Sequence, residues 1–299
     1  MIKQMNFSPP AVPGPTAVAL GFFDGLHLAH QQVIGRAVRA VGLVPAVFTF
    51  QTDSTAPASK RAGLLMEEWQ KEELLGRMGV RVLWSPCFYQ FAHLSPENFV
   101  KQVLVSGFQA RLVCCGYNYT FGKGGSAGPK ELSDLCEKAG VQCETLPAVE
   151  RLGSPVSSSR IRQAIGEGDM KQAAALLGRP FTLEERVETG RQLGRRLRFP
   201  TINQRLPEGF VQPRFGVYAS ETVVNGIRYP SITNVGRKPT VGSDAILAET
   251  HLLGNHQNLY GLRVPVSLLE FMRPEQKFPS IETLQAQVLR DIALRKQMG

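Results

Sequence analysis

The stretch "ALGFFDGLHLAHQQVIGRA", residues 19–37, decides the fold of the first half of the chain. It begins within an apolar run and passes through a turn-forming segment that holds Gly21 and Gly25. After that segment the apolar residues recur at helical intervals. His27 and His30 stand where that helical pattern begins. Backbone N–H groups and the positive end of the helix dipole collect at such a position and favour anions. The stretch predicts a strand, a turn and a phosphate-binding helix N-terminus; the alternative is a plain strand–turn–helix with two exposed histidines.

Short β-branched runs and amphipathic stretches alternate from this segment to about residue 150. For example, "VPAVFTF" (44–50) precedes "LLMEEWQKEELLGRMG" (64–79), and "ARLVCCG" (110–116) precedes "GPKELSDLCEKAG" (128–140). Such alternation predicts a parallel sheet with helices on both faces. Ligands bind to these sheets beyond the carboxyl ends of the strands, which is where His27 and His30 fall.

The pattern changes after "GRPFTLEE" (178–185), and we place a domain boundary near residue 182. Beyond it, "GVYASETVV" (216–224) and "IRYPSITNVG" (227–236) are separated by Asn225-Gly226, a dipeptide that favours a tight hairpin turn. The final "SIETLQAQVLRDIALRKQ" (280–297) has helical periodicity, and Ser280 at its start is a typical helix N-cap residue. We therefore expect an α/β domain over 1–182 and a small antiparallel β-barrel with a terminal helix over 183–299.

The net charge of +9 lies almost wholly in the second half of the chain. Residues 1–150 carry 13 Lys and Arg against 12 Asp and Glu, whereas residues 151–299 carry 21 against 13. The second half therefore suits an anionic ligand, either nucleic acid or a nucleoside triphosphate. The five cysteines lack paired C-x-x-C spacing, which indicates buried thiols rather than zinc ligands or disulfides. The chain shows neither a signal peptide nor a long apolar segment, so we expect a cytoplasmic protein without membrane partners.

"GFFDGLHLAH" (21–30) resembles the G-x-F-D-G-x-H-x-G-H signature of nucleotidyltransferases, in the version found in bacterial bifunctional riboflavin kinase/FAD synthetases. The resemblance continues along nearly the whole chain, in the order of that family, through the segments "FAHLSPENFV", "GYNYTFGKG", "VSSSRIRQAIGEGDMKQAAALLGRPF", "GRQLGRRLRFPTIN", "ITNVGRKPT", "AETHLL" and "RPEQKF". It implies a Rossmann-like nucleotidyltransferase domain followed by a barrel that resembles riboflavin kinase.

In the first domain, the resemblance implies adenylyl transfer from ATP to FMN, which gives FAD and pyrophosphate. No protein nucleophile is needed, because such catalysis consists of positioning and charge neutralisation. His27 and His30 would contact the phosphates, and Ser158 and Arg160 would hold the departing pyrophosphate; a helix cap is the alternative role of "SSSR". The other residues that the resemblance assigns to nucleotide or flavin binding are Gly21, Phe23, Asp24, Gly25, Asn118 and Thr120. For Asn118 and Thr120, loop hydrogen bonding is the alternative.

In the second domain, the resemblance implies transfer of the γ-phosphate of ATP to the ribityl hydroxyl of riboflavin. A neutral hydroxyl is a poor nucleophile, and Glu249 in "AETHLL" matches the general base of the family. By periodicity alone, Glu249 is an exposed strand glutamate. Thr201 and Asn203 in "PTIN" match the pair that holds Mg²⁺. The remaining residues matched to ATP or flavin binding are Gly190, Gly194 and Asn234.

Three positions depart from the family pattern. Ala29 stands in place of a glycine, "TFQTDST" (49–55) replaces T-F-D-P-H-P, and Arg198 replaces the glycine before F-P-T. We expect an enzyme that makes FMN and then FAD from small-molecule substrates, with no nucleic-acid partner; the sequence does not indicate its oligomeric state. Two alternatives stay open: an adenylyltransferase with a weakened kinase, and a flavin-sensing regulator that binds nucleic acid.

Overall fold

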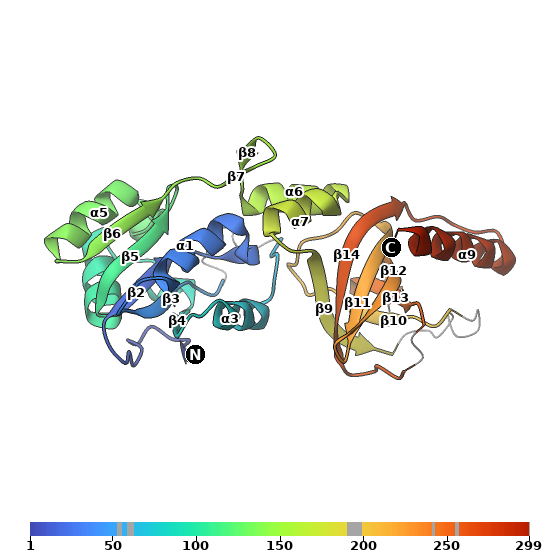
Figure 1. Cartoon of the computed structure of the whole chain (residues 1–299), viewed down its shortest axis with the longest axis horizontal. Helices are drawn as coiled ribbons and strands as arrows, with labels where there is room; N and C mark the ends of the chain where they lie inside the picture. The colour runs from blue at the N-terminus through green and yellow to red at the C-terminus, as the bar shows by residue number, and fades with distance from the viewer. Residues whose placement is uncertain (53–55, 59–62, 190–198, 241–242, 255–256, 299) are drawn as a thin grey trace. The chain divides into compact units, whose positions relative to one another are not determined.

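The strand–helix alternation of the first half folds into one sheet of six parallel strands (Figure 1). The computed structural model describes residues 1–52, 56–58, 63–189, 199–240, 243–254 and 257–298. The chain divides into two units, Met1–Ser158 and Ser159–Gly299. The sheet lies in the first unit, in the order β1-β4-β3-β2-β5-β6. Its strands are β1 (Ile2–Gln4), β2 (Thr16–Leu20), β3 (Val44–Phe48), β4 (Val82–Trp84), β5 (Ala110–Gly116) and β6 (Gln142–Leu146).

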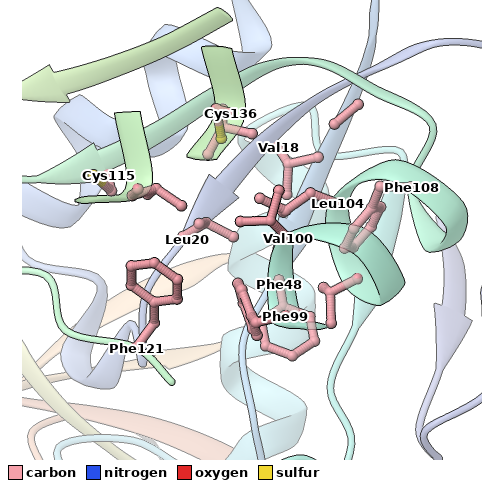
Figure 2. Close-up of a cluster of buried hydrophobic side chains, with 14 of the residues drawn as sticks. Val18, Leu20, Phe48, Phe99, Val100, Leu104, Phe108, Cys115, Phe121 and Cys136 are labelled. Atoms are coloured by element: carbon pink, nitrogen blue, oxygen red, sulfur yellow. The ribbon is translucent and has the colours of Figure 1, made fainter. Parts of the chain in front are cut away.

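Helices cover both faces of this sheet, because successive strand residues point to opposite sides. In β2, Val18 and Leu20 pack into one apolar cluster (Figure 2). Ala17 and Ala19 pack into another. The first cluster includes residues of α4 (Pro96–Phe99), η3 (Val100–Gly107) and α5 (Pro129–Lys138), and the second includes residues of α1 (Leu28–Val38) and α3 (Glu68–Arg77). Parallel strands buried on both faces are apolar throughout, which explains the continuous β-branched runs. The predicted α/β architecture is confirmed.

The second unit contains a closed barrel of six antiparallel strands, as the sequence predicts. The order around the barrel is β10-β13-β12-β11-β14-β9, so the first and last strands in sequence, β9 and β14, are neighbours. The strands are β9 (Phe181–Glu188), β10 (Ile202–Arg205), β11 (Gly216–Val224), β12 (Ile227–Thr240), β13 (Ser243–Leu252) and β14 (Arg263–Arg273). Buried Gln204 of β10 donates hydrogen bonds of 2.7 Å to the carbonyls of Glu185 and Val264. Its amide therefore ties β10 to β9 and β14 where the barrel closes.

The turn between β11 and β12 has the conformation that its sequence predicts. Asn225 and Gly226 both have positive φ, 51° and 78°. A type I′ turn requires positive φ at both central residues, and its twist matches that of the flanking strands. The dipeptide therefore sets the register of the hairpin formed by β11 and β12.

Helix α9 (Ile281–Gln297) is attached to the barrel by two buried charged residues. Arg273 of β14 donates to Asp291 at 2.7 Å, and Arg295 donates to the carbonyl of Ser220 in β11 at 3.1 Å. Ser280 caps the helix, and its capping-box partner is Thr283. Across the described residues, no helix combines the length and apolar character that crossing a membrane demands.

Two further helices precede the barrel, α6 (Ser158–Glu167) and α7 (Met170–Leu177). The division into units falls after Ser158, at the start of α6. The backbone N–H of Arg214 donates to the carbonyl of Ile165, so α6 packs with the barrel unit. The functional boundary near residue 182 stays a prediction.

Candidate active sites

The first site is built on the turn between β2 and α1. Gly21 follows β2, and Phe23, Gly25 and Leu26 then have positive φ, which reverses the chain within a few residues. A Cβ on Gly25 would lie 2.7 Å from Cδ1 of Leu65, in addition to the strain of its φ of 79°. Phe23 is buried beneath the turn. The glycine is therefore required both by the turn and by the side chain packed against it.

His27 and His30 lie against each other at the start of α1. His27 is the N-cap residue, and its Nδ1 accepts the backbone N–H of His30 at 3.3 Å. The two rings are stacked, with centroids 3.5 Å apart, and the rings of Phe23 and His30 lie edge to face, with centroids 5.3 Å apart. His27 is 4% exposed and His30 is half-buried, so the alternative of two exposed histidines is wrong. Because Nδ1 of His27 is an acceptor, a neutral His27 carries its proton on Nε2.

The same turn contacts Ser158, the last residue of the first unit. Asp24 is 2% exposed, and its Oδ1 accepts the backbone N–H of Leu65 at 2.9 Å. Its backbone carbonyl accepts the hydroxyl of Ser158 at 3.1 Å. The structure therefore brings Ser158 to the histidine turn, whereas its role in holding pyrophosphate stays a prediction. Arg160 lies two residues further along α6, in the second unit.

Asn118 and Thr120 lie on the loop that follows β5. Both are exposed, and the loop is held by a hydrogen bond from the N–H of Tyr119 to the carbonyl of Gly116. Strand β5 is the direct neighbour of β2 and runs parallel to it. The two residues therefore emerge at the same edge of the sheet as the histidine turn.

A cavity of about 420 Å³ also opens at these strand ends. Lys71 is only 3% exposed there, with its ammonium 2.9 Å from Glu68 and 5.0 Å from the centre of the Phe22 ring. The cavity is lined by Met5, Phe22, Asp24, Gln51, Thr52, Leu64, Met66, Glu68, Lys71 and Glu72. Two of these, Gln51 and Thr52, belong to the stretch that departs from the family pattern; residues 53–55 of that stretch lie outside the described part. Lys71 does not stand out in the sequence, because a lysine on an amphipathic helix is ordinarily exposed.

The second site is a row of three side chains across adjacent barrel strands. Glu249 of β13 is paired with Asn203 of β10 on one side and with Asn234 of β12 on the other. Directly paired residues share one face of a sheet, with Cβ atoms about 4.5–5.5 Å apart. Asn203 is 9% exposed, and Glu249 and Asn234 are half-buried. Glu249 is thus flanked by two amides rather than standing alone on an exposed strand.

Thr201 lies two residues before Asn203, at the entrance to β10. The ring of His251, two residues after Glu249, makes a 2.8 Å hydrogen bond through Nδ1 to the carbonyl of Pro200. The rings of His251 and Phe199 also lie edge to face, with centroids 5.8 Å apart. His251, which the sequence left unassigned, therefore holds the segment that leads to Thr201. Gly190, Gly194 and Arg198 lie outside the described residues.

All five cysteines are free thiols, and their reactivities are expected to differ. Cys87 and Cys143 are half-buried, while the other three are buried. A hydrogen bond with Cys115 lowers the pKa of Cys143, but a second one with Cys136 and burial together raise that pKa to about 12. At pH 8 only on the order of one Cys143 in 10⁴ is then a thiolate, which is the reactive form.

We expect iodoacetamide at pH 8 to label Cys143 in the folded protein at least about 100-fold more slowly than in guanidinium chloride. Peptide mass spectrometry after timed quenching measures both rates. Cys87, also half-buried, serves as the internal reference for access of the reagent. Equal labelling of Cys143 in the folded and unfolded chains would contradict the raised pKa.

Comparison with known proteins gives the same two-part organisation. The FAD synthetase family model matches residues 10–160, and the riboflavin kinase family model matches residues 177–298. The bifunctional riboflavin kinase/FMN adenylyltransferase of Listeria monocytogenes is 35% identical over 92% of this chain and 89% of its own length. The protein of the same name from Bacillus subtilis is 33% identical over 92% and 90%. A crystal structure titled as a macrolide-efflux protein from Streptococcus pneumoniae has a TM-score of 0.88 and 29% identity, over 99% of this chain and 98% of that one.

Proposed function

Because this chain belongs to the bifunctional riboflavin kinase/FMN adenylyltransferase family, and so catalyses both reactions, we propose which of its residues carry each of them. The protein phosphorylates riboflavin to FMN with ATP, and it transfers the adenylyl group of a second ATP to FMN. The observation that carries this conclusion is the match of both family models, in order, together with relatives more than 30% identical over 92% of the chain. Neither the weakened-kinase alternative nor the regulator alternative is favoured.

For adenylyl transfer, His27 and His30 donate hydrogen bonds to the phosphates of ATP at the start of α1. An oxygen of the FMN phosphate attacks the α-phosphorus, and the bond to pyrophosphate breaks. Negative charge builds on the phosphates in this step, and donors fixed before the reaction stabilise it most. The Nε2–H of His27 is such a donor, because the helix cap fixes the ring through Nδ1.

The surrounding residues complete this site. Ser158 and Arg160 bind the departing pyrophosphate, where a guanidinium offers a planar set of donors that suits phosphate oxygens. The glycines and Asp24 hold the turn, with Phe23 packed beneath it. Asn118 and Thr120 contact the substrates from the neighbouring loop. The cavity beside Asp24 offers an aromatic ring and a cation, Phe22 and Lys71, to a flavin or nucleotide.

For riboflavin phosphorylation, the carboxylate of Glu249 accepts the proton of the ribityl hydroxyl. The hydroxyl oxygen attacks the γ-phosphorus of ATP, and ADP leaves. Asn203 and Asn234 flank this base and orient the groups around it. Thr201 and Asn203 supply a hydroxyl and an amide oxygen beside a carboxylate, a set of hard oxygen donors that suits Mg²⁺ with its waters and phosphates. The ion would neutralise charge on the nucleotide, and Gly190 and Gly194 would let the backbone approach it.

Incubation of the purified protein with riboflavin, Mg²⁺ and ATP tests the function as a whole. We expect chromatography to find both FMN and FAD. FAD formed only from supplied FMN would indicate the weakened kinase, and no turnover would indicate the regulator. The cytoplasmic location stays a prediction.

Arg198 is expected to leave the kinase active. We expect Arg198→Gly to phosphorylate riboflavin within about threefold of the parent rate, because Thr201, Asn203, Asn234 and Glu249, to which the kinase chemistry is assigned, are all present in the parent. Initial rates of FMN formation at saturating ATP measure this. An inactive parent that glycine rescues would show that the arginine blocks the site.

A further inference from the structure

The segment between β14 and α9 places an acidic side chain on the barrel beside the kinase row. Asn234 donates from Nδ2 to Oε1 of Glu275 at 3.3 Å. A Cβ on Gly236 would lie 2.1 Å from the same oxygen and 2.7 Å from the carboxyl carbon. The carboxylate therefore rests against the bare backbone of β12, in a position that only a glycine leaves open.

This contact lies on the same face as the base. Asn234 is directly paired with Glu249, and Gly236 is paired with Leu247 two residues further along. Residues two apart in a strand point to one side, so Asn234 and Gly236 both face outward with Glu249. Glu275 thus contacts Asn234, the residue paired with the base on the neighbouring strand.

Both ends of the segment that carries Glu275 are anchored. On one side, Arg273 makes a two-pronged contact with Asp291 of α9, at 3.1 Å from Nε and 2.7 Å from Nη2. On the other side, Ser280 caps α9. A short span held at both ends restricts where its side chains can lie, so the Glu275 contact needs little further ordering.

We propose that Glu275 is a positioning residue for riboflavin phosphorylation, acting through Asn234. By accepting one N–H of the Asn234 amide, it fixes which way that amide faces. The amide oxygen and the second N–H then point to fixed places beside Glu249, where the substrate hydroxyl reacts. This inference rests on the proposed role of Glu249 as the base.

The test compares three variants at the contact. Glu275→Ala is expected to lower kcat for riboflavin phosphorylation about fivefold to tenfold, the range of one lost hydrogen bond, and to leave the KM for ATP within twofold. Glu275→Gln keeps an acceptor oxygen and is expected to stay within twofold of the parent. Gly236→Ala displaces the carboxylate and is expected to match Glu275→Ala.

Combining the variants separates positioning from simple damage. If Gly236 acts by admitting the carboxylate, Gly236→Ala with Glu275→Ala is no slower than either alone, whereas independent effects multiply. Gln276→Ala, an exposed neighbour in the same segment, is the matched control and is expected to behave as the parent. Thermal unfolding followed by circular dichroism serves as the folding control for every variant.

Three outcomes would overturn the proposal: full kcat in Glu275→Ala, a Glu275→Gln variant as slow as Glu275→Ala, or multiplied losses in the double variant. Measurement of Glu249→Gln in the same assay separates the role of Glu249 as the base from the role of Glu275 as a positioning residue. If that variant retains full kinase activity, the proposed base is wrong, whatever the Glu275 variants show.

Discussion

Replacing Glu249 by glutamine is expected to suppress riboflavin phosphorylation about 10²–10⁴-fold, the usual contribution of general-base catalysis, while adenylylation of supplied FMN continues at the parent rate. The amide keeps the shape of the side chain and its place between Asn203 and Asn234, but it cannot accept the hydroxyl proton. Timed assays that start from riboflavin and, separately, from FMN measure the two reactions. The barrel should fold unchanged, because the backbone pairing of residue 249 with residues 203 and 234 does not depend on its side chain.

Glu221→Gln is the matched control for this variant. Glu221 is also a barrel-strand glutamate, but its carboxylate is paired with Arg228. We expect its removal to leave both reactions within about twofold, as for most surface ion pairs. Undiminished phosphorylation by Glu249→Gln would make Glu249 structural, and another base would have to be sought.

His30→Ala is expected to remove most FAD formation, by about 10²–10³-fold, because one donor to the transition state is lost. FMN formation from riboflavin should stay nearly intact. The helix start survives this change, since the bond to Nδ1 of His27 comes from the backbone N–H of residue 30, which alanine keeps. The readout is the rate of FAD formation from supplied FMN and ATP.

The exposed His93 lies in the same unit, and His93→Ala provides the comparison. It should form both flavins at the parent rate. An equal loss of FMN and FAD formation in His30→Ala would indicate damaged folding. Unchanged FAD formation would remove His30 from the mechanism.

The features that sequence predicts well are those set by near neighbours along the chain. The spacing of His27 and His30 brings two rings to one helix start, and the structure stacks them there. A type I′ turn requires positive φ at both central residues, and Asn225-Gly226 adopts it readily, so these two residues alone predict the hairpin. Apolar runs alone indicate a parallel sheet buried on both faces.

The features that sequence analysis misses depend on partners far away in the chain. The row of Asn203, Glu249 and Asn234 depends on strand register, which pattern alone does not set for strands so far apart in sequence. Lys71 carries a charge on a helical pattern. Its burial against the ring of Phe22, which lies far earlier in the chain, is not visible in that pattern. The family resemblance supplied Glu249 as a candidate base, whereas periodicity alone favoured an exposed glutamate.

Because β9 pairs with β14, the barrel can close only late in translation. The first unit has its last sheet strand once Leu146 has emerged, whereas the barrel cannot close until β14, which begins at Arg263, is available to β9. At roughly 5–20 residues per second, translation separates the two moments by on the order of ten seconds. During that interval a nascent chain can hold a folded adenylyltransferase sheet beside an open row of barrel strands, whose unpaired edges are exposed to chaperones and to other chains.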